Sequence, residues 1–292
     1  MPADVKPHYR TALVGDHAMT RCYALLLPLV VFLCASCQAT EEDAVSMVLA
    51  RGGKVTRDEN LPGRPVVAVD LIAAHHDVSD GDLKLLKTLK GLKELNLDFA
   101  TITDVGLKEL KELKGLQKLC LAGTYITDAG LVDLFKELKD LRMLDLGVNK
   151  ITKTALKAVS ELKCLEELRL IDTQITDADL EIIKEMASLR VLMLIRAKVT
   201  DTGVRELRNL KGLQTLYLGE TKITDACLKD LKELKDLKDL SLGYTAITDA
   251  GLKDLAELKG LKKLDLSYTK ITNAGLYAIR EALPGTAVSY AR

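Results

Sequence analysis

Leucine recurs along most of the chain in a pattern that restarts about every 24 residues. From Leu92 the chain reads L-K-E-L-N-L-D-F-A-T-I-T-D-V-G-L-K-E-L-K-E-L-K-G, and the same frame restarts at Leu116, Leu141, Leu165, Leu189, Leu213, Leu237 and Leu261. The step from Leu116 to Leu141 is 25 residues long, because Phe135 interrupts the usual spacing. A weaker copy precedes these, which makes nine repeats over residues 68–284. A fixed period of this length predicts a solenoid built from stacked copies of one structural unit.

Each repeat changes its hydrophobic period once. Leu95 and Leu97 are two residues apart, which predicts a strand, whereas Leu107 and Leu110 are three apart, which predicts a helix. Stacked copies can bury their leucines between a parallel sheet and a layer of helices. Strands lie ~4.8 Å apart and helices need ~10 Å, so the stack must bend. We therefore predict an α/β solenoid with a parallel sheet on its concave face and α-helices on its convex face.

The segment before the predicted helix reads I-T-D-V-G at residues 102–106, and the other repeats carry variants of this I-T-D-x-G pattern. A threonine or aspartate there can accept hydrogen bonds from the free N–H groups of the first helical turn, and the acid complements the helix dipole. Seven repeats carry the acid, at Asp80, Asp104, Asp128, Asp177, Asp201, Asp225 and Asp249. Lys153 and Asn273 replace it in the other two, so we expect Thr152 to be the cap in its own repeat.

Both flanks of the repeats differ from them. Residues 1–37 read as a leader with a lipoprotein-type signal peptide, 38–67 as a linker and helical cap, and 285–292 as a C-terminal cap strand. The apolar run Tyr23–Cys34 is 12 residues long, too short for a membrane-spanning helix but suited to a secretory signal. A buried hydrophobic helix with an incidental cysteine is the alternative. Ala35 and Ser36 then precede Cys37.

Two family resemblances rest on these residues. The pattern around Cys37 resembles the lipobox of bacterial lipoproteins, which implies lipidation of Cys37, export to the cell envelope and a membrane anchor of two acyl chains. Gln38 after the cysteine slightly favours the outer membrane. The pattern L-x-x-L-x-L-x-x-T-x-I-T-D-x-G-L resembles cysteine-containing leucine-rich repeats, and is similar to repeat proteins of planctomycete-like bacteria. The second resemblance covers about three quarters of the chain and implies the fold, but it leaves the function open.

Charge and composition narrow the possible partners. Lysine plus arginine and aspartate plus glutamate both number 42, so no basic footprint for nucleic acid is expected. Aromatic residues make up only 4%, and tryptophan is absent, which argues against platforms that stack sugars or bases. Cys120, Cys164 and Cys227 form no C-x-x-C pair, so neither a zinc site nor a disulfide framework is supported.

Two positions of the repeat vary in size and charge while the others stay nearly constant. One lies between the second and third leucines, and the other lies two residues after the third. We expect both to point away from the leucines on the concave sheet and to bind a partner, through Asn96, Phe99, Asp145, Arg169, Asp172, Arg196, Tyr217, Glu220, Tyr244 and Tyr268. Aromatic and arginine side chains are common anchors of protein interfaces. A merely solvated sheet face is the alternative, and the arginines could pair with the neighbouring acids.

Catalytic chemistry is not expected. His75 is the only histidine predicted on this face, no nucleophile lies in a sharp turn, and no glycine-rich phosphate loop exists. We predict a non-catalytic scaffold without cofactor, metal, nucleic acid or small-molecule substrate. It would be anchored in a bacterial cell envelope by lipid and bind a protein or peptide partner. The alternative is a structural envelope protein that assembles with itself or the cell wall and has no discrete ligand.

Overall fold

The computed structural model describes residues 39–292, which form one open sheet with a layer of helices. Within this range eleven strands lie in chain order, and only β1 and β2 pair antiparallel. The strands are β1 (Lys54–Arg57), β2 (Val66–Asp70), β3 (Glu94–Asn96), β4 (Lys118–Cys120), β5 (Met143–Asp145), β6 (Glu167–Arg169), β7 (Val191–Met193), β8 (Thr215–Tyr217), β9 (Asp239–Ser241), β10 (Lys263–Asp265) and β11 (Ala287–Ser289). The strands β2 to β10 supply one strand to each of the nine predicted repeats.

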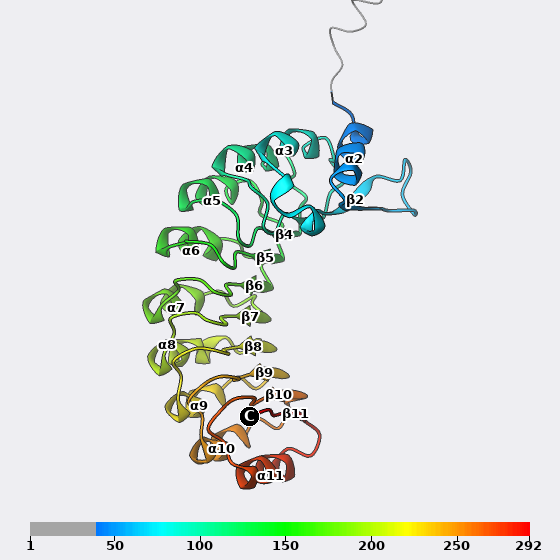
Figure 1. Ribbon diagram of the computed structural model, residues 1–292. Helices are drawn as coiled ribbons and strands as arrows, with labels where there is room; N and C mark the ends of the chain where they lie inside the picture. The colour runs from blue at the N-terminus through cyan, green and yellow to red at the C-terminus, as the bar shows by residue number, and fades with distance from the viewer. Residues whose placement is uncertain (1–38) are drawn as a thin grey trace, which may run out of the picture. The chain divides into compact units, whose positions relative to one another are not determined.

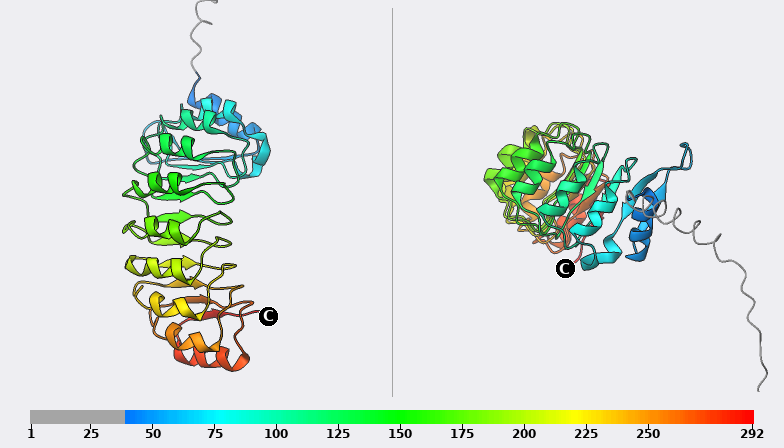
Figure 2. Two further views of the ribbon diagram at one scale, coloured as in Figure 1. Left: turned by 90° about the vertical axis from the view of Figure 1, so that its left-hand side faces the viewer. Right: turned by 90° about the horizontal axis from the view of Figure 1, so that it is seen from above.

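The helices stack on the outer side of the arc, and the strands follow its inner side (Figures 1 and 2). They are α2 (Glu41–Ala50), α3 (Asp80–Leu86), α4 (Asp104–Leu110), α5 (Asp128–Leu134), α6 (Lys153–Ser160), α7 (Asp177–Ile183), α8 (Asp201–Glu206), α9 (Leu228–Leu231), α10 (Leu252–Leu255) and α11 (Asn273–Ala282). Short 3-10 turns precede or follow some of them: η1 (Ile72–Asp77), η2 (Leu207–Asn209), η3 (Asp225–Cys227) and η4 (Asp249–Gly251). This arrangement confirms the predicted solenoid. No helix in residues 39–292 has the length and apolarity needed to cross a membrane.

The leucines of every repeat form one continuous core between the two layers. Leu95, Leu119 and Leu144 lie in register on adjacent strands and are fully buried. The inserted Phe135 is 1% exposed, so the extra residue of its repeat fills the core instead of looping out. Burial of this apolar surface holds each repeat to the next, since one repeat alone cannot enclose its leucines.

The acid of the I-T-D-x-G segment binds the next repeat, which corrects our expectation that it caps its own helix. Thr103 donates its backbone N–H and its hydroxyl to the carboxylate of Asp80, at 2.8 and 2.7 Å. The threonine is the cap: Thr103 Oγ1 accepts from the N–H of Val105 at 3.2 Å. The same contact to the following threonine is made by Asp104, Asp128, Asp177, Asp201, Asp225 and Asp249. We call these seven residues the aspartate ladder.

The recurring glycine after the acid makes room for this ladder. A Cβ atom on Gly203 would lie 2.4 Å from Oδ1 of Asp177, and one on Gly106 would lie 2.4 Å from Oδ1 of Asp80. Both distances are far below van der Waals contact. Glycine at this position therefore leaves room for the carboxylate of the preceding repeat, and it is not there for an unusual backbone angle of its own. Ala155 and Cys227 take the same position opposite Asp128 and Asp201, so the contact also forms beside a small side chain.

One ladder contact is missing, and a local substitute takes its place. Lys153 stands where the acid should be, so Thr176 of the next repeat receives no carboxylate from α6. Its N–H and hydroxyl instead donate to Asp179 of its own helix, at 2.9 and 2.8 Å. Asp179 occupies the position at which Gly106 and Gly203 leave space for the ladder. The N–H and hydroxyl of each capping threonine thus donate to a carboxylate, which comes either from the preceding repeat or from the threonine's own helix. Thr152 caps α6 as predicted, since its side chain accepts from the N–H of Thr154.

Threonines at the ninth position of the repeat close the loop after each strand. Their hydroxyls donate to the carbonyl three residues earlier, as Thr173 does to Leu170 at 2.7 Å and Thr221 to Leu218 at 2.6 Å. These threonine hydroxyls thus satisfy carbonyl groups of the loop that follows each strand.

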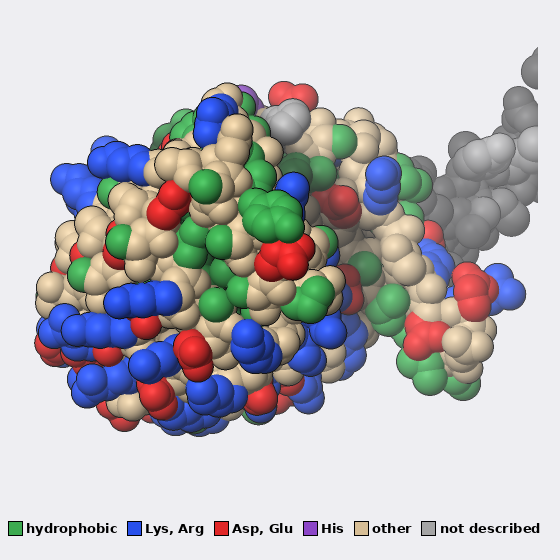
Figure 3. Space-filling model, turned by 90° about the horizontal axis from the view of Figure 1, so that it is seen from below, with side chains coloured by type: hydrophobic (Ala, Val, Ile, Leu, Met, Phe, Trp, Pro, Cys, Tyr) green, Lys and Arg blue, Asp and Glu red, His purple; other side chains and the backbone are tan. Residues whose placement is uncertain are grey.

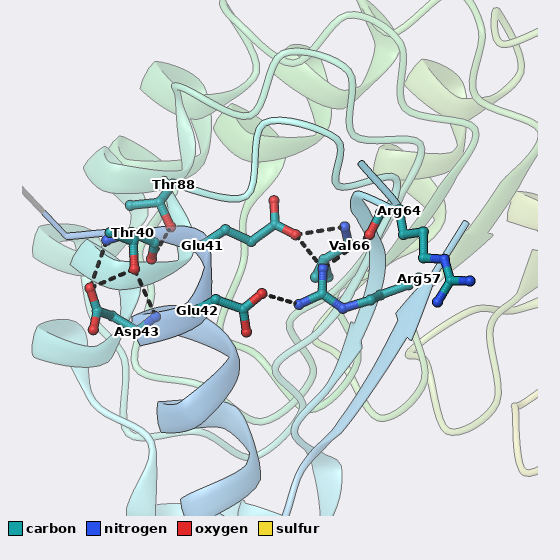
Figure 4. A network of polar contacts seen from close by, with 8 residues as sticks. All are labelled: Thr40, Glu41, Glu42, Asp43, Arg57, Arg64, Val66 and Thr88. Carbon is teal, nitrogen blue, oxygen red and sulfur yellow. Dashed lines mark hydrogen bonds and ion pairs between the residues drawn. The ribbon is translucent and has the colours of Figure 1, made fainter. Parts of the chain in front are cut away.

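The first repeat is covered by α2 and the β1–β2 hairpin. Arg57 donates to Glu41 and Glu42 at 2.8 and 2.6 Å, and Glu41 also accepts the N–H of Val66 at 3.2 Å (Figure 4). The hairpin was not predicted, because Lys54–Arg57 lies outside the repeat pattern. At the other end β11 pairs parallel with β10 and covers the last repeat.

Candidate protein-binding surface

The second variable row lies in a sharp turn after each strand, not on the strand as we predicted. Its residues have φ between 54° and 64° and are Phe99, Gly123, Val148, Asp172, Arg196, Glu220, Tyr244 and Tyr268. We call this set the turn row. The strands are only three residues long and end before it, so the alternation of a strand does not decide where these side chains point.

Each turn-row residue is held by a hydrogen bond to the next repeat. The N–H of Phe99 donates to the carbonyl of Ala122 at 2.7 Å, and that of Tyr244 donates to Ser267 at 2.8 Å. The left-handed conformation costs a residue with a Cβ about 1–2 kcal/mol, and glycine avoids this cost. Only one of the eight positions holds glycine. The turn row therefore carries side chains at positions where the left-handed backbone conformation favours glycine.

These side chains are exposed and unlike one another along the row. Phe99 lies against Gly123, since a Cβ on that glycine would be 2.5 Å from its ring. Arg196 Nε and Glu220 Oε2 form an ion pair at 2.8 Å in the middle of the row. At the far end Tyr244 and Tyr268 are 57% and 45% exposed, and their rings stack with centroids 4.3 Å apart. The row thus has apolar groups at both ends and charges between them.

The last residue of each strand forms the first variable row, and it is less accessible than predicted. Asn96, Arg169 and Tyr217 are half-buried, whereas Asp145 is only 7% exposed. Asp145 accepts the N–H of Gly147 at 2.9 Å and lies 3.7 Å from Arg169. The expectation that Asp145 is free to meet a partner is therefore wrong.

Arg169 is held by acids on its own sheet. Its Nε lies 2.6 Å from Glu167, in addition to the contact with Asp145. Side-chain hydrogen bonding and charge from Glu167 and Asp145 raise the pKa of Arg169 against the opposing effect of burial. The expected pairing of arginines with neighbouring acids is confirmed both here and for Arg196 with Glu220. It leaves these groups less available to a partner.

A third row on the same face was missed. The first residue of each strand also lies opposite the buried middle leucine, because side chains of a strand alternate between its faces. Glu94 and Lys118 in this row form an ion pair at 2.7 Å. Asp239 accepts the hydroxyl of Tyr217 at 3.2 Å. Alternation around the second leucine was the signal that could have found it.

Two titratable groups at the ends of β3 and β4, Asp98 and Cys120, have raised pKa values. Burial raises the pKa of Asp98 to about 6, opposed by the N–H of Ala122 and reinforced by the charge of Asp145. Burial also raises the pKa of the Cys120 thiol to about 12, and the charge of Asp98 adds to the effect. A thiol with so high a pKa is a poor nucleophile at neutral pH.

No group of three or more metal-ligating side chains occurs in residues 39–292. Cys37, the predicted lipidation site, lies outside the described residues. What remains accessible on the inner side is the turn row, with half-buried strand side chains beside it.

Comparison with known proteins agrees with this architecture. Models described as leucine rich repeat match residues 211–271 and 92–111. The solved structure of internalin C2 from Listeria monocytogenes is 26% identical, covers 73% of this chain and 84% of its own, and has a TM-score of 0.53. A leucine-rich-repeat protein of Leptospira interrogans is 25% identical over 70% of this chain and 62% of its own, with a TM-score of 0.51. No curated protein is similar enough to match. The chain is thus a leucine-rich-repeat protein by sequence pattern and by fold, and such repeats commonly form scaffolds for protein interaction.

Proposed function

We propose that this protein is a non-catalytic scaffold that binds a protein or peptide partner through the turn row and the adjoining concave sheet. The observation that carries the proposal is the retention of exposed phenylalanine, valine, arginine and tyrosine in a left-handed turn that favours glycine. Strained backbone positions of this kind cluster at binding and active sites. Exposed aromatic side chains are frequent binding anchors.

The order of groups along the turn row suggests the kind of partner. Phe99 and Val148 lie at one end, the stacked tyrosines at the other, and Asp172, Arg196 and Glu220 between them. A complementary partner would carry apolar anchors at both ends and hydrogen-bonding groups in the middle. Because Arg196 and Glu220 already pair, the charged middle contributes orientation more than affinity.

A photo-crosslinking amino acid at Tyr268 tests this proposal in the cells that make the protein. Tyr277 on α11 is the matched control, because it is a tyrosine of the last repeat that is 69% exposed on the outer side. We expect a discrete heteromeric adduct from position 268 that disappears when Phe99 is also changed to alanine. Equal adducts from both positions would contradict a binding surface at the turn row. An adduct of two copies of this chain would favour the self-assembling alternative.

We also propose that the scaffold is tethered to a bacterial cell envelope through lipid on Cys37, slightly favouring the outer membrane. This rests on the apolar run before the small residues Ala35 and Ser36. Cys37→Ala should move the protein from the membrane fraction to the soluble fraction. A Cys164→Ala control, at an exposed thiol of the solenoid, should leave it in place. Membrane association that survives Cys37→Ala would refute the tether.

A further inference from the structure

The outer face carries an apolar groove between α5 and α6. Its volume is about 430 Å³, within the range of small-molecule sites. The half-buried Val132 and Ala158 form its floor, and the buried Phe135 lies beneath them. The exposed lysines Lys136, Lys139 and Lys157 stand around it, together with Glu161 and Thr154.

At several places along the helical side a lysine of one helix pairs with an acid of the next, as Lys87 does with Glu109 at 2.7 Å and Lys184 with Glu206 at 2.8 Å. In α6 the place of that acid is taken by Ala158. The small side chain both opens the groove and supplies no carboxylate to Lys136.

Positive charge therefore collects around an apolar floor. Lys136 has only Asp133 of its own helix segment, at 3.7 Å, and Asp133 also pairs with Lys111. Among residues 39–292 neither Lys139 nor Lys157 forms an ion pair. On the part of the helical side that is visible from below, acidic side chains lie among the lysines and arginines (Figure 3, left-hand side).

We propose that this groove binds a small anionic amphiphile, whose apolar body lies on Val132 and Ala158, above the buried Phe135. Its carboxylate, phosphate or sulfonate would accept charge-assisted hydrogen bonds from Lys136, Lys139 and Lys157. A neutral or cationic ligand of the same shape would leave the lysines uncompensated. The site is on the outer face, away from the turn row, so it does not depend on the proposed partner-binding function.

Calorimetric titration with monomeric decyl phosphate tests the site, with decyltrimethylammonium as the probe of equal tail and opposite charge. Ala158→Glu restores the acid found in other repeats, so the variant should fold while filling the groove and neutralising Lys136. We expect it to weaken decyl phosphate binding roughly tenfold or more, since a repulsive charge replaces an apolar contact. Lys139→Glu combined with Lys157→Glu should do the same.

The matched control reverses two exposed lysines elsewhere on the helical side, Lys229 and Lys235, and should bind decyl phosphate like the wild type. Thermal unfolding of each variant verifies folding. Unchanged affinity of the Ala158→Glu variant would overturn the proposal. So would equal binding of the cationic probe, or association with phosphatidate vesicles without binding of the monomer.

Discussion

Replacing Lys153 and Asp179 together should restore the aspartate ladder at the only internal gap in it. Lys153→Asp places a carboxylate where the preceding repeats have one, and Asp179→Gly clears the space that this carboxylate needs. Asp179→Gly alone removes the carboxylate that now binds Thr176. Lys153→Asp alone introduces a second carboxylate, but Asp179 still occupies the space that it needs. We therefore predict strong coupling between the effects of these two substitutions on the free energy of unfolding, although the residues are 26 positions apart in the sequence.

The size of the coupling follows from the contacts at Thr176. Asp179 accepts its N–H and hydroxyl at 2.9 and 2.8 Å, and loss of such a cap costs about 1 kcal/mol. Glycine in the helix adds about 0.5–1 kcal/mol, so Asp179→Gly should cost about 2 kcal/mol. Lys153→Asp alone should cost up to ~1 kcal/mol, because its carboxylate meets that of Asp179. The double variant should lie within about 1 kcal/mol of the wild type, since the carboxylate introduced by Lys153→Asp then binds Thr176.

Urea unfolding of the wild type, both single variants and the double variant measures this coupling. Lys153→Gln with Asp179→Gly is the control, because it opens the space without supplying an acid, and it should remain about 2 kcal/mol less stable. A double variant that is as unstable as the control, or less stable, would refute the view that Asp179 substitutes for the ladder.

Three further predictions concern single residues. Val148 has φ 56°, and a branched Cβ is unfavourable there, so Val148→Asn should raise the unfolding free energy by about 0.5–1 kcal/mol, whereas Val105→Asn on helix α4 should give no gain. The pKa of Asp98 is raised from 3.8 to about 6, so the folded state holds its proton more tightly and stability should fall as pH rises through this window. Asp98→Asn should then stabilise by about 1 kcal/mol at pH 7.5, after allowance for solvent screening, and much less below pH 4; equal gains at both pH values would contradict the assignment. Iodoacetamide at neutral pH should label exposed Cys164 well before Cys120, whose thiol pKa is raised to about 12, as peptide mass spectrometry would show; equally rapid labelling would count against the burial.

The candidate surface was only partly predictable. Variation at Phe99, Tyr244 and Tyr268 identified residues free from packing, because a position that fills the core cannot change size from repeat to repeat. The same reasoning failed for Asp145, which hydrogen-bonds to Gly147 and is buried by its neighbours. It also placed the turn row on strands, since periodicity does not reveal that a strand ends after three residues.

The sequence by itself determined the solenoid, its nine repeats and the side on which the strands lie. Leucines at spacings of two and then three residues can be buried in few other ways, and the different widths of strands and helices require the bend. The tertiary structure alone decided which atoms of one repeat meet the next. The partner of Asp177 is Thr200, and the groove beside Lys136 depends on Ala158 in the following helix. Such contacts follow from the register between stacked repeats, which the pattern within one repeat does not contain.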